Sequence, residues 1–129
     1  MLLATDLDGT FLAGDPEDRL SLYQTIAAHP EIKLAYVTGR SLEAVLPLLA
    51  DPTLPQPDYI IADVGATLVH GDSLQPIQPL QSVVDARWPG EPQVASAIEA
   101  FGLERQDVPQ ARRCSYFCTP RSEERRVGK

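Results

Sequence analysis

The sequence predicts an α/β fold in which short apolar strands alternate with amphipathic helices. Three segments support this, in the order strand, helix, strand: an apolar run over residues 1–4, a helical pattern over 16–27 and a second apolar run over 32–37. Such a succession forms a right-handed βαβ unit with two parallel strands. Their carboxyl ends share the edge at which open α/β sheets bind ligands.

The composition narrows the class of protein. The chain has 129 residues with 43% hydrophobic side chains, which suits one domain or a piece of a larger one. A net charge of -7 argues against nucleic acid and against an anionic membrane surface as partners. No segment has the apolar length of a membrane span, and the N-terminus lacks the basic region of a signal peptide, so we expect a cytoplasmic location.

Two helices have recognisable starts. Asp15 is the expected N-cap of the first, with Pro16 at its first position, and Ser41 is the expected N-cap of the second. Their apolar stripes are expected to be buried. The residues are Leu20, Tyr23, Ile26 and Ala27 in the first helix, and Leu42, Val45, Leu46 and Leu49 in the second.

The middle of the chain reads as a loop, a strand and a hairpin. Pro47, Pro52, Pro55 and Pro57 predict an extended loop, and residues 58–62 predict a third strand. Residues 67–69 and 74–77 predict a hairpin that turns at Gly71-Asp72.

Weaker patterns follow from about residue 80. Two helical stripes are expected, the second closed by Gly102, and a strand over 112–119. Cys114 and Cys118 are four positions apart in that strand, about 13 Å, which is too far for a disulfide. We therefore expect both cysteines to be packing residues. The stripes comprise Val83, Val84 and Trp88, then Val94, Ala97, Ile98 and Phe101.

Two carboxylates follow the first strand, in the run Asp6-Leu7-Asp8-Gly9-Thr10. Residues i and i+2 of a strand point the same way, roughly 7 Å apart, so both could face one site. Carboxylates this close repel each other unless a proton or a cation lies between them. Mg²⁺ prefers carboxylate, water and phosphate oxygens and suits such a site. The plainer interpretation is an Asp-Gly turn after a buried strand.

The run resembles the first motif of the haloacid dehalogenase (HAD) phosphatase superfamily, Asp-x-Asp-Gly-Thr. The resemblance implies that Asp6 is a nucleophile that forms an aspartyl-phosphate and that Asp8 is the general acid. It also implies that both carboxylates belong to an Mg²⁺ site and that Gly9 and Thr10 help to bind the phosphate.

A second polar cluster, Thr38-Gly39-Arg40-Ser41, follows the second strand. A hydroxyl, a glycine and a helix N-terminus at one point favour anion binding. The second HAD motif is a Ser or Thr at this place, so the resemblance implies that Thr38 donates a hydrogen bond to the phosphoryl group. Gly39 and Arg40 would help to hold the phosphate or the substrate. Taken alone, Thr38 could be an ordinary strand residue and Arg40 a solvated charge.

The third strand extends the resemblance. The pattern Pro-Asp-Tyr-Ile-Ile-x-x-Val-Gly over residues 57–65, with Thr-Gly-Arg-Ser upstream, resembles the sucrose-phosphate phosphatase-like (Cof-type, C2B cap) group. Where that group has Val-Gly-Thr, this chain has Val64-Gly65-Ala66 after an acidic Asp63. The resemblance implies a HAD-like Rossmannoid parallel sheet, as a partial core over 1–79, and the start of an inserted α+β cap over 80–120. Residues 121–129 are expected to be a non-native tail.

The resemblance implies an Mg²⁺-dependent phosphomonoester hydrolase acting on a sugar phosphate. It also predicts a later Lys or Arg and an acidic pair, which we do not find, so we expect a truncated chain with little activity. An acidic protein repels phosphate, so a metal ion and local cations would have to reverse the charge at the site. Another phosphorylated metabolite, phosphomutase chemistry and a non-catalytic phosphate-binding or interaction remnant remain open.

Overall fold

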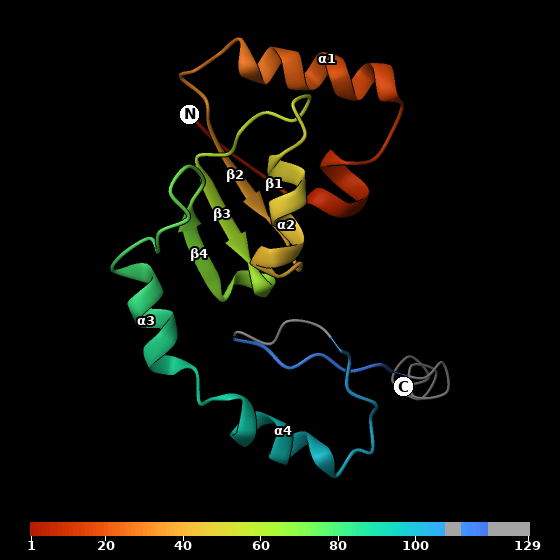
Figure 1. The fold of residues 1–129 in the computed structure, drawn as a ribbon, viewed down its shortest axis with the longest axis vertical. Helices are drawn as coiled ribbons and strands as arrows, with labels where there is room; N and C mark the ends of the chain where they lie inside the picture. Colours follow the sequence, from red (N-terminus) through yellow and green to blue (C-terminus); the bar gives the residue numbers. More distant parts are fainter. Residues whose placement is uncertain (108–111, 119–129) are drawn as a thin grey trace.

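The computed structural model describes residues 1–107 and 112–118, and its centre is a four-stranded sheet (Figure 1). The strand order is β1-β2-β3-β4, with β1 (Leu2–Thr5), β2 (Lys33–Val37) and β3 (Tyr59–Ala62) parallel. β4 (Thr67–His70) runs antiparallel to β3. The predicted α/β fold with a parallel core is confirmed.

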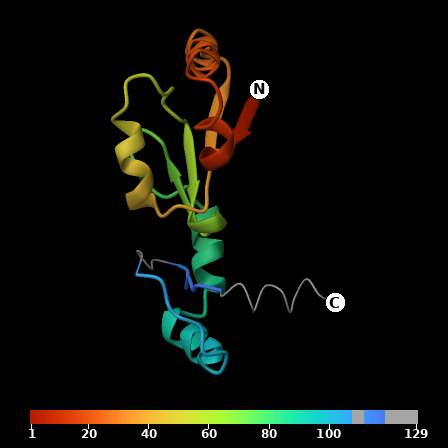
Figure 2. The same ribbon diagram turned by 90° about the vertical axis from the view of Figure 1, so that its right-hand side faces the viewer.

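Four helices accompany the sheet: α1 (Pro16–Ala27), α2 (Leu42–Leu49), α3 (Leu80–Arg87) and α4 (Glu91–Glu99). Two tight turns, η1 (Leu7–Phe11) and η2 (Asp63–Gly65), follow β1 and β3. Helices α3 and α4 and residues 112–118 lie beyond the end of the sheet toward which β1, β2 and β3 point (Figure 1, Figure 2). Within the described residues, no helix is both long and apolar enough to cross a membrane.

Both predicted helix caps are confirmed. The Asp15 carboxylate accepts hydrogen bonds from the backbone N–H groups of Glu17 and Asp18, at 3.1 and 3.2 Å. The Ser41 hydroxyl accepts one from Ala44 N–H at 3.2 Å. These side chains satisfy N–H groups that have no partner inside a helix, and so fix where α1 and α2 begin.

The buried core lies between the sheet, α1, α2 and η1. Some expected core residues are instead exposed: Leu20 by 43%, Leu46 by 39% and Phe101 by 74%. Leu46 follows the fully buried Val45 by one position, which turns it about 100° around the helix and out of the core. The core residues are Leu7, Phe11, Tyr23, Ile26, Leu34, Tyr36, Val45, Leu54, Ile60, Ala62 and Val69.

Pro47 lies inside α2, so its assignment to the loop was wrong. Proline has no N–H to donate to the carbonyl four residues earlier, and the helix ends soon afterwards at Leu49. The turn at Gly71 forms, with a backbone hydrogen bond from Leu74 to His70 at 2.9 Å. Its second arm makes an isolated bridge between Val69 and Pro76. Two backbone hydrogen bonds of 2.9 Å, from His70 to Gln75 and from Ile77 to Leu68, also join this arm to β4, so the predicted hairpin forms.

Residues 112–118 do not form the predicted strand; they make an isolated bridge between Arg105 and Tyr116. Cys114 is half-buried and Cys118 exposed, so the expectation of a packing role is wrong for Cys118. Neither cysteine forms a disulfide, as expected. Thr119 and the expected tail over 121–129 lie outside the described residues.

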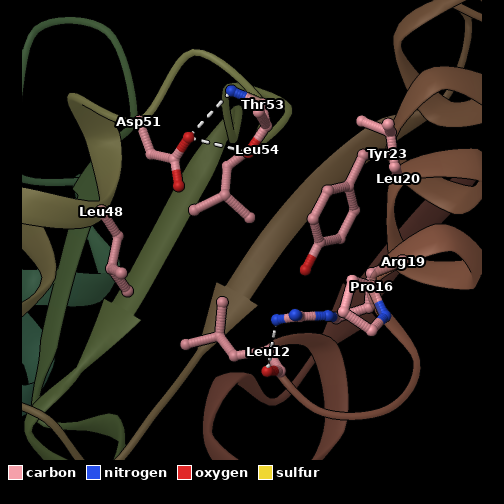
Figure 3. A pocket seen from close by; sticks show the side chains of 9 residues that line it. All are labelled: Leu12, Pro16, Arg19, Leu20, Tyr23, Leu48, Asp51, Thr53 and Leu54. Atoms are coloured by element: carbon pink, nitrogen blue, oxygen red, sulfur yellow. Dashed lines mark hydrogen bonds between the residues drawn. The ribbon is translucent and has the colours of Figure 1, made fainter.

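A hollow of about 320 Å³ lies at the C-terminal end of α2, away from the sheet edge considered below (Figure 3). Arg19 donates a hydrogen bond to the Leu12 carbonyl there at 2.9 Å, and the Asp51 carboxylate caps Thr53. These contacts shape the local loops, although Arg19 Nε is buried without a hydrogen-bond partner among the described residues. The lining residues are Leu12, Pro16, Arg19, Leu20, Tyr23, Leu48, Asp51, Thr53 and Leu54.

Candidate active site

A hollow of about 480 Å³ lies at the carboxyl ends of β1 and β2. Thr5 and Tyr36 are register partners in the parallel pair, so the residues that follow them emerge at the same sheet edge. The structure thereby brings three of the predicted site residues, Asp6, Thr38 and Gly39, into the lining of one hollow. The lining residues are Ala4, Thr5, Asp6, Val37, Thr38, Gly39, Val64 and Gly65.

Asp6 ends the strand and starts the turn η1. Its carboxylate accepts a hydrogen bond from Leu7 N–H at 2.8 Å, while the side chain stays exposed toward the hollow. Gly9 has φ +77°, a left-handed conformation that glycine adopts at little cost. Gly9 and Thr10 therefore belong to the turn that folds back over the end of β1.

Asp8 does not line the hollow but is held by Arg40. The Arg40 guanidinium donates from Nε to one carboxylate oxygen at 2.8 Å and from Nη2 to the other at 2.6 Å. These hydrogen bonds, more than the charge of Arg40, hold the pKa of Asp8 below its usual range. Asp8 is therefore ionised at neutral pH in this arrangement.

Thr38 is buried at the end of β2. Its hydroxyl oxygen accepts a hydrogen bond from Arg40 N–H at 3.0 Å, and the hydroxyl hydrogen can donate to another group. Backbone hydrogen bonds from Thr38 to Ile61 and from Val64 to Thr38, at 2.9 and 3.2 Å, tie this residue to the end of β3. Thr38 and Gly39 are thus firmly placed beside Asp6.

The turn η2 contributes residues that the sequence patterns did not single out as functional. Asp63, Val64 and Gly65 have φ values of +52°, +59° and +97°. Left-handed conformations are uncommon for residues other than glycine and are genuine outliers for β-branched ones. They persist where the surroundings over-determine them, often at functional sites. Val64 is 79% exposed and lines the hollow, whereas Asp63 is 3% exposed.

Two arginines from residues 112–118 reach this edge of the sheet. Arg113 donates a hydrogen bond to the Gly39 carbonyl, and its Nε lies 3.6 Å from Asp63 Oδ1. Arg112 donates to Asp85 and, at 3.3 Å, to the Thr67 hydroxyl. Sequence reasoning missed these contacts because no local pattern encodes a separation of 74 positions. The only signal was an acidic residue, Asp63, where the resembling group has another pattern.

The residues fit Mg²⁺ in part. Mg²⁺ commonly takes one or two carboxylates and completes its shell with water and phosphate oxygens. Asp6 offers an exposed carboxylate of this kind, while Asp8 would first have to part from Arg40. The described part of the chain contains no group of three or more His, Cys, Asp or Glu side chains that could hold a metal ion.

Comparison with known structures defines the class. Over 84% of its length the chain superposes on a haloacid dehalogenase-like hydrolase from Bacillus subtilis, with TM-score 0.57 and 16% identity, covering 45% of that chain. A second solved structure is the sucrose-phosphatase of Synechocystis in complex with sucrose and phosphate. It gives TM-score 0.69 and 26% identity over 93% of this chain and 49% of its own. The fold is that of the HAD-like hydrolases.

The particular family follows from the sequence profile of the Sucrose-6F-phosphate phosphohydrolases, which matches residues 1–128. The chain belongs to this family. It is also 88% identical over 120 residues to a glucosylglycerol-phosphate synthase of Pseudomonas anguilliseptica. That match covers 93% of this chain and 16% of the relative, so the chain spans only a small part of that protein.

Proposed function

We propose that the site is that of an Mg²⁺-dependent phosphomonoester hydrolase, which cleaves a sugar phosphate through an aspartyl-phosphate on Asp6. The observation that carries this proposal is the side-by-side placement of Asp6 and Thr38 at the ends of two adjacent parallel strands, on one hollow. A carboxylate nucleophile and a hydroxyl donor at one edge are what phosphoryl transfer requires.

Each residue has a defined task in the proposed reaction. The Asp6 carboxylate attacks phosphorus, while the Thr38 hydroxyl and the backbone around Gly39 bind the phosphoryl oxygens. Gly9 and Thr10 close the turn beside them. Asp8 gives a proton to the leaving oxygen and later takes one from the attacking water. Asp6 would hold the Mg²⁺ ion, whose charge would offset those of the phosphate and the carboxylate.

The ion pair between Asp8 and Arg40 sets a condition on this reaction. A carboxylate that accepts two hydrogen bonds from Arg40 cannot donate a proton. Arg40 therefore has to exchange Asp8 for a phosphate oxygen when the substrate binds, and Asp8 then has to take up a proton from solvent before it can give one to the leaving oxygen. If Arg40 stays on Asp8, the site binds phosphate without turning it over, and the same ion pair is the observation that favours this second candidate function.

The relatives support a glycosylated substrate. The sucrose-phosphatase was solved with sucrose and phosphate, and the relative with 88% identity is named for glucosylglycerol phosphate. We therefore propose glucosylglycerol phosphate as the substrate. The chain spans 49% of the sucrose-phosphatase and carries neither of the two later HAD motifs, so we propose that turnover by these 129 residues is slow.

The test is binding and turnover by the full chain in Mg²⁺. Isothermal titration with beryllofluoride, an acyl-phosphate mimic, should show binding that Asp6→Asn abolishes. Thr38→Val should weaken it by roughly tenfold, as expected for one hydrogen bond to a charged group. Thr25→Val, whose hydroxyl bonds only locally to Ser21 at 2.9 Å, is the matched control.

Phosphate release from glucosylglycerol phosphate then separates the two functions. Slow release that Asp6→Asn abolishes supports the hydrolase, whereas binding without release supports the phosphate-binding site. Absence of binding in the wild type would refute both.

A further inference from the structure

We propose that Asp63 and Arg113 form a clamp for a hydroxyl group of the sugar, next to the hollow that takes the phosphate. The inference rests on the proposed function and deepens it. Neither side chain is part of the lining, but each adjoins a residue that is: Arg113 is bound to the Gly39 carbonyl, and Asp63 directly precedes Val64. A sugar attached to a phosphate at Asp6 and Thr38 would extend toward neighbouring groups of this kind.

The Asp63 side chain is buried and that of Arg113 half-buried, and both are incompletely bonded. Asp63 is 2% exposed and Arg113 16% exposed at the side chain. Asp63 Oδ2 accepts a hydrogen bond from Thr67 at 2.6 Å. Asp63 Oδ1 and Arg113 Nε are both buried and, within the described residues, neither has a hydrogen-bond partner. They face each other at 3.6 Å, which is longer than a hydrogen bond.

Such a pair is poorly arranged for stability alone. Buried charges are costly unless each remaining donor and acceptor is satisfied, and an optimised guanidinium–carboxylate contact closes to about 2.8 Å. Here one acceptor and one donor lie side by side with their hydrogen-bonding capacity unused. The arrangement is therefore suited to a third group that both donates and accepts.

A hydroxyl has this property, since it can donate to Asp63 Oδ1 and accept from Arg113 Nε. An oxygen about 2.8 Å from each atom completes a triangle on the 3.6 Å base. The oxygens of an ionised phosphomonoester carry no hydrogen to donate, and Asp63 would repel their negative charge. Both atoms are covered in the unliganded chain, so the Arg113 side chain has to open to admit the hydroxyl and then return to its place beside Asp63.

The backbone fixes the clamp relative to the phosphate loop. Asp63 N–H donates to the Arg40 carbonyl at 2.8 Å, and Val64 N–H donates to the Thr38 carbonyl at 3.2 Å. These bonds hold the left-handed conformations of η2 and place the carboxylate at a set distance from Thr38. In this position the clamp would contact the sugar, while Asp6 and Thr38 would contact the phosphate.

The experiment compares two ligands on the full chain in Mg²⁺: glucosylglycerol phosphate and inorganic phosphate. The variants are Asp63→Asn and Arg113→Gln, with Arg87→Gln as the matched control, because Arg87 is exposed on α3 and is not part of the hollow's lining. In both clamp variants, affinity for the glycoside phosphate should fall about tenfold, while that for inorganic phosphate changes less than about twofold. Arg87→Gln should change neither affinity.

Several results would overturn the clamp. Equal losses of affinity for both ligands would indicate that Arg113 binds phosphate. No loss of affinity for either ligand would indicate that the pair only anchors residues 112–118 to the sheet edge. If the wild type binds the glycoside phosphate no more tightly than inorganic phosphate, the clamp is refuted but the phosphate site is not. A wild type that binds neither ligand refutes the proposed function itself, and the clamp with it. Circular dichroism of each variant establishes that the chain is folded. If Asp63→Asn unfolds the chain, the comparison of the two ligands is made with Arg113→Gln, which lies outside the sheet.

Discussion

Arg40 holds both carboxylate oxygens of Asp8, at 2.8 and 2.6 Å, across the gap between the turn after β1 and the loop after β2. The two strands are thus linked at their carboxyl ends by a bidentate ion pair as well as by the sheet. Both partners are partly solvated, with side-chain exposures of 33% for Arg40 and 58% for Asp8. The pair therefore acts mainly on the protonation of Asp8 and on the position of Arg40.

Arg40→Gln should raise the pKa of Asp8 toward the ordinary aspartate value of about 3.9. The lowered pKa favours the folded state above that value, and this contribution disappears as the pH falls through the lower pKa of the folded chain. The variant should therefore lose less stability than the wild type between about pH 5 and pH 2. Carbon-detected NMR of the Asp8 carboxyl measures the shift directly.

The control for this titration is Arg87→Gln, a change of the same kind at an exposed position on α3. It should leave the Asp8 titration unchanged. An Asp8 pKa that is the same in Arg40→Gln and in the wild type would show that the ion pair does not form in solution.

Gly71→Ala should destabilise the fold by about 3 kcal/mol, because it forces backbone to move. A Cβ at Gly71 would lie 1.8 Å from the Pro57 carbonyl oxygen, and Gly71 N–H donates to the Asp58 carbonyl at 2.8 Å. Urea unfolding measures the change. Gly39→Ala is the matched control for stability, since the nearest atom to its Cβ is 3.9 Å away. Equal stabilities of the two variants would contradict the close approach at Gly71.

Gln81→Leu should cost about 2 kcal/mol, because it leaves two backbone groups without their partner. The buried Gln81 amide accepts from Leu68 N–H at 2.7 Å and donates to the Ala66 carbonyl at 3.1 Å, which fastens α3 to β4. Thermal unfolding followed by circular dichroism tests this. Gln93→Leu, at an exposed position of α4, should change stability little. A neutral Gln81→Leu would mean that α3 is not docked in this way.

Local sequence signals predicted the elements that depend on local chemistry. Asp15, Pro16 and Ser41 define helix starts through contacts within three residues, and the structure has them as expected. The apolar runs likewise placed β1, β2 and β3 to within a residue or so. Because parallel strands align their carboxyl ends, the grouping of Asp6, Thr38 and Gly39 on one hollow followed as well.

Contacts between distant segments could not be predicted in this way. Helical periodicity marks a face but not what covers it, so Leu20 was expected to be buried and is exposed. The pairing of β4 with β3 depends on how the chain reverses at η2, which the apolar patterns do not specify. The approach of Arg113 to Asp63 depends on the path of the chain between them, and the link of Arg40 to Asp8 depends on which rotamer each side chain adopts.

Leu2→Lys should reduce self-association of the chain. β1 lies at one edge of the sheet, pairing only with β2 among the described strands, and Leu2 is 62% exposed there. Exposed apolar edge strands pair with other chains, and a lysine on the edge opposes this. Sedimentation velocity should show concentration-dependent association of the wild type that is weaker in Leu2→Lys. Leu22→Lys, at an exposed position of α1, is the control; an equal effect there would point to general solubility rather than to the edge.

The edge position of β1 also affects the local stability of the segment that carries the proposed nucleophile. Among the described strands, β2 and β3 each have a strand on both sides and β1 has one neighbour, so the amide hydrogens of β1 should exchange with solvent before those of β2 and β3. Asp6 stands at the end of the segment that opens first. A ligand that bridges Asp6 and Thr38 would join β1 to β2 at a further point, and would therefore slow that opening. Ligand binding at the site and local folding of β1 are therefore thermodynamically linked, so that each favours the other.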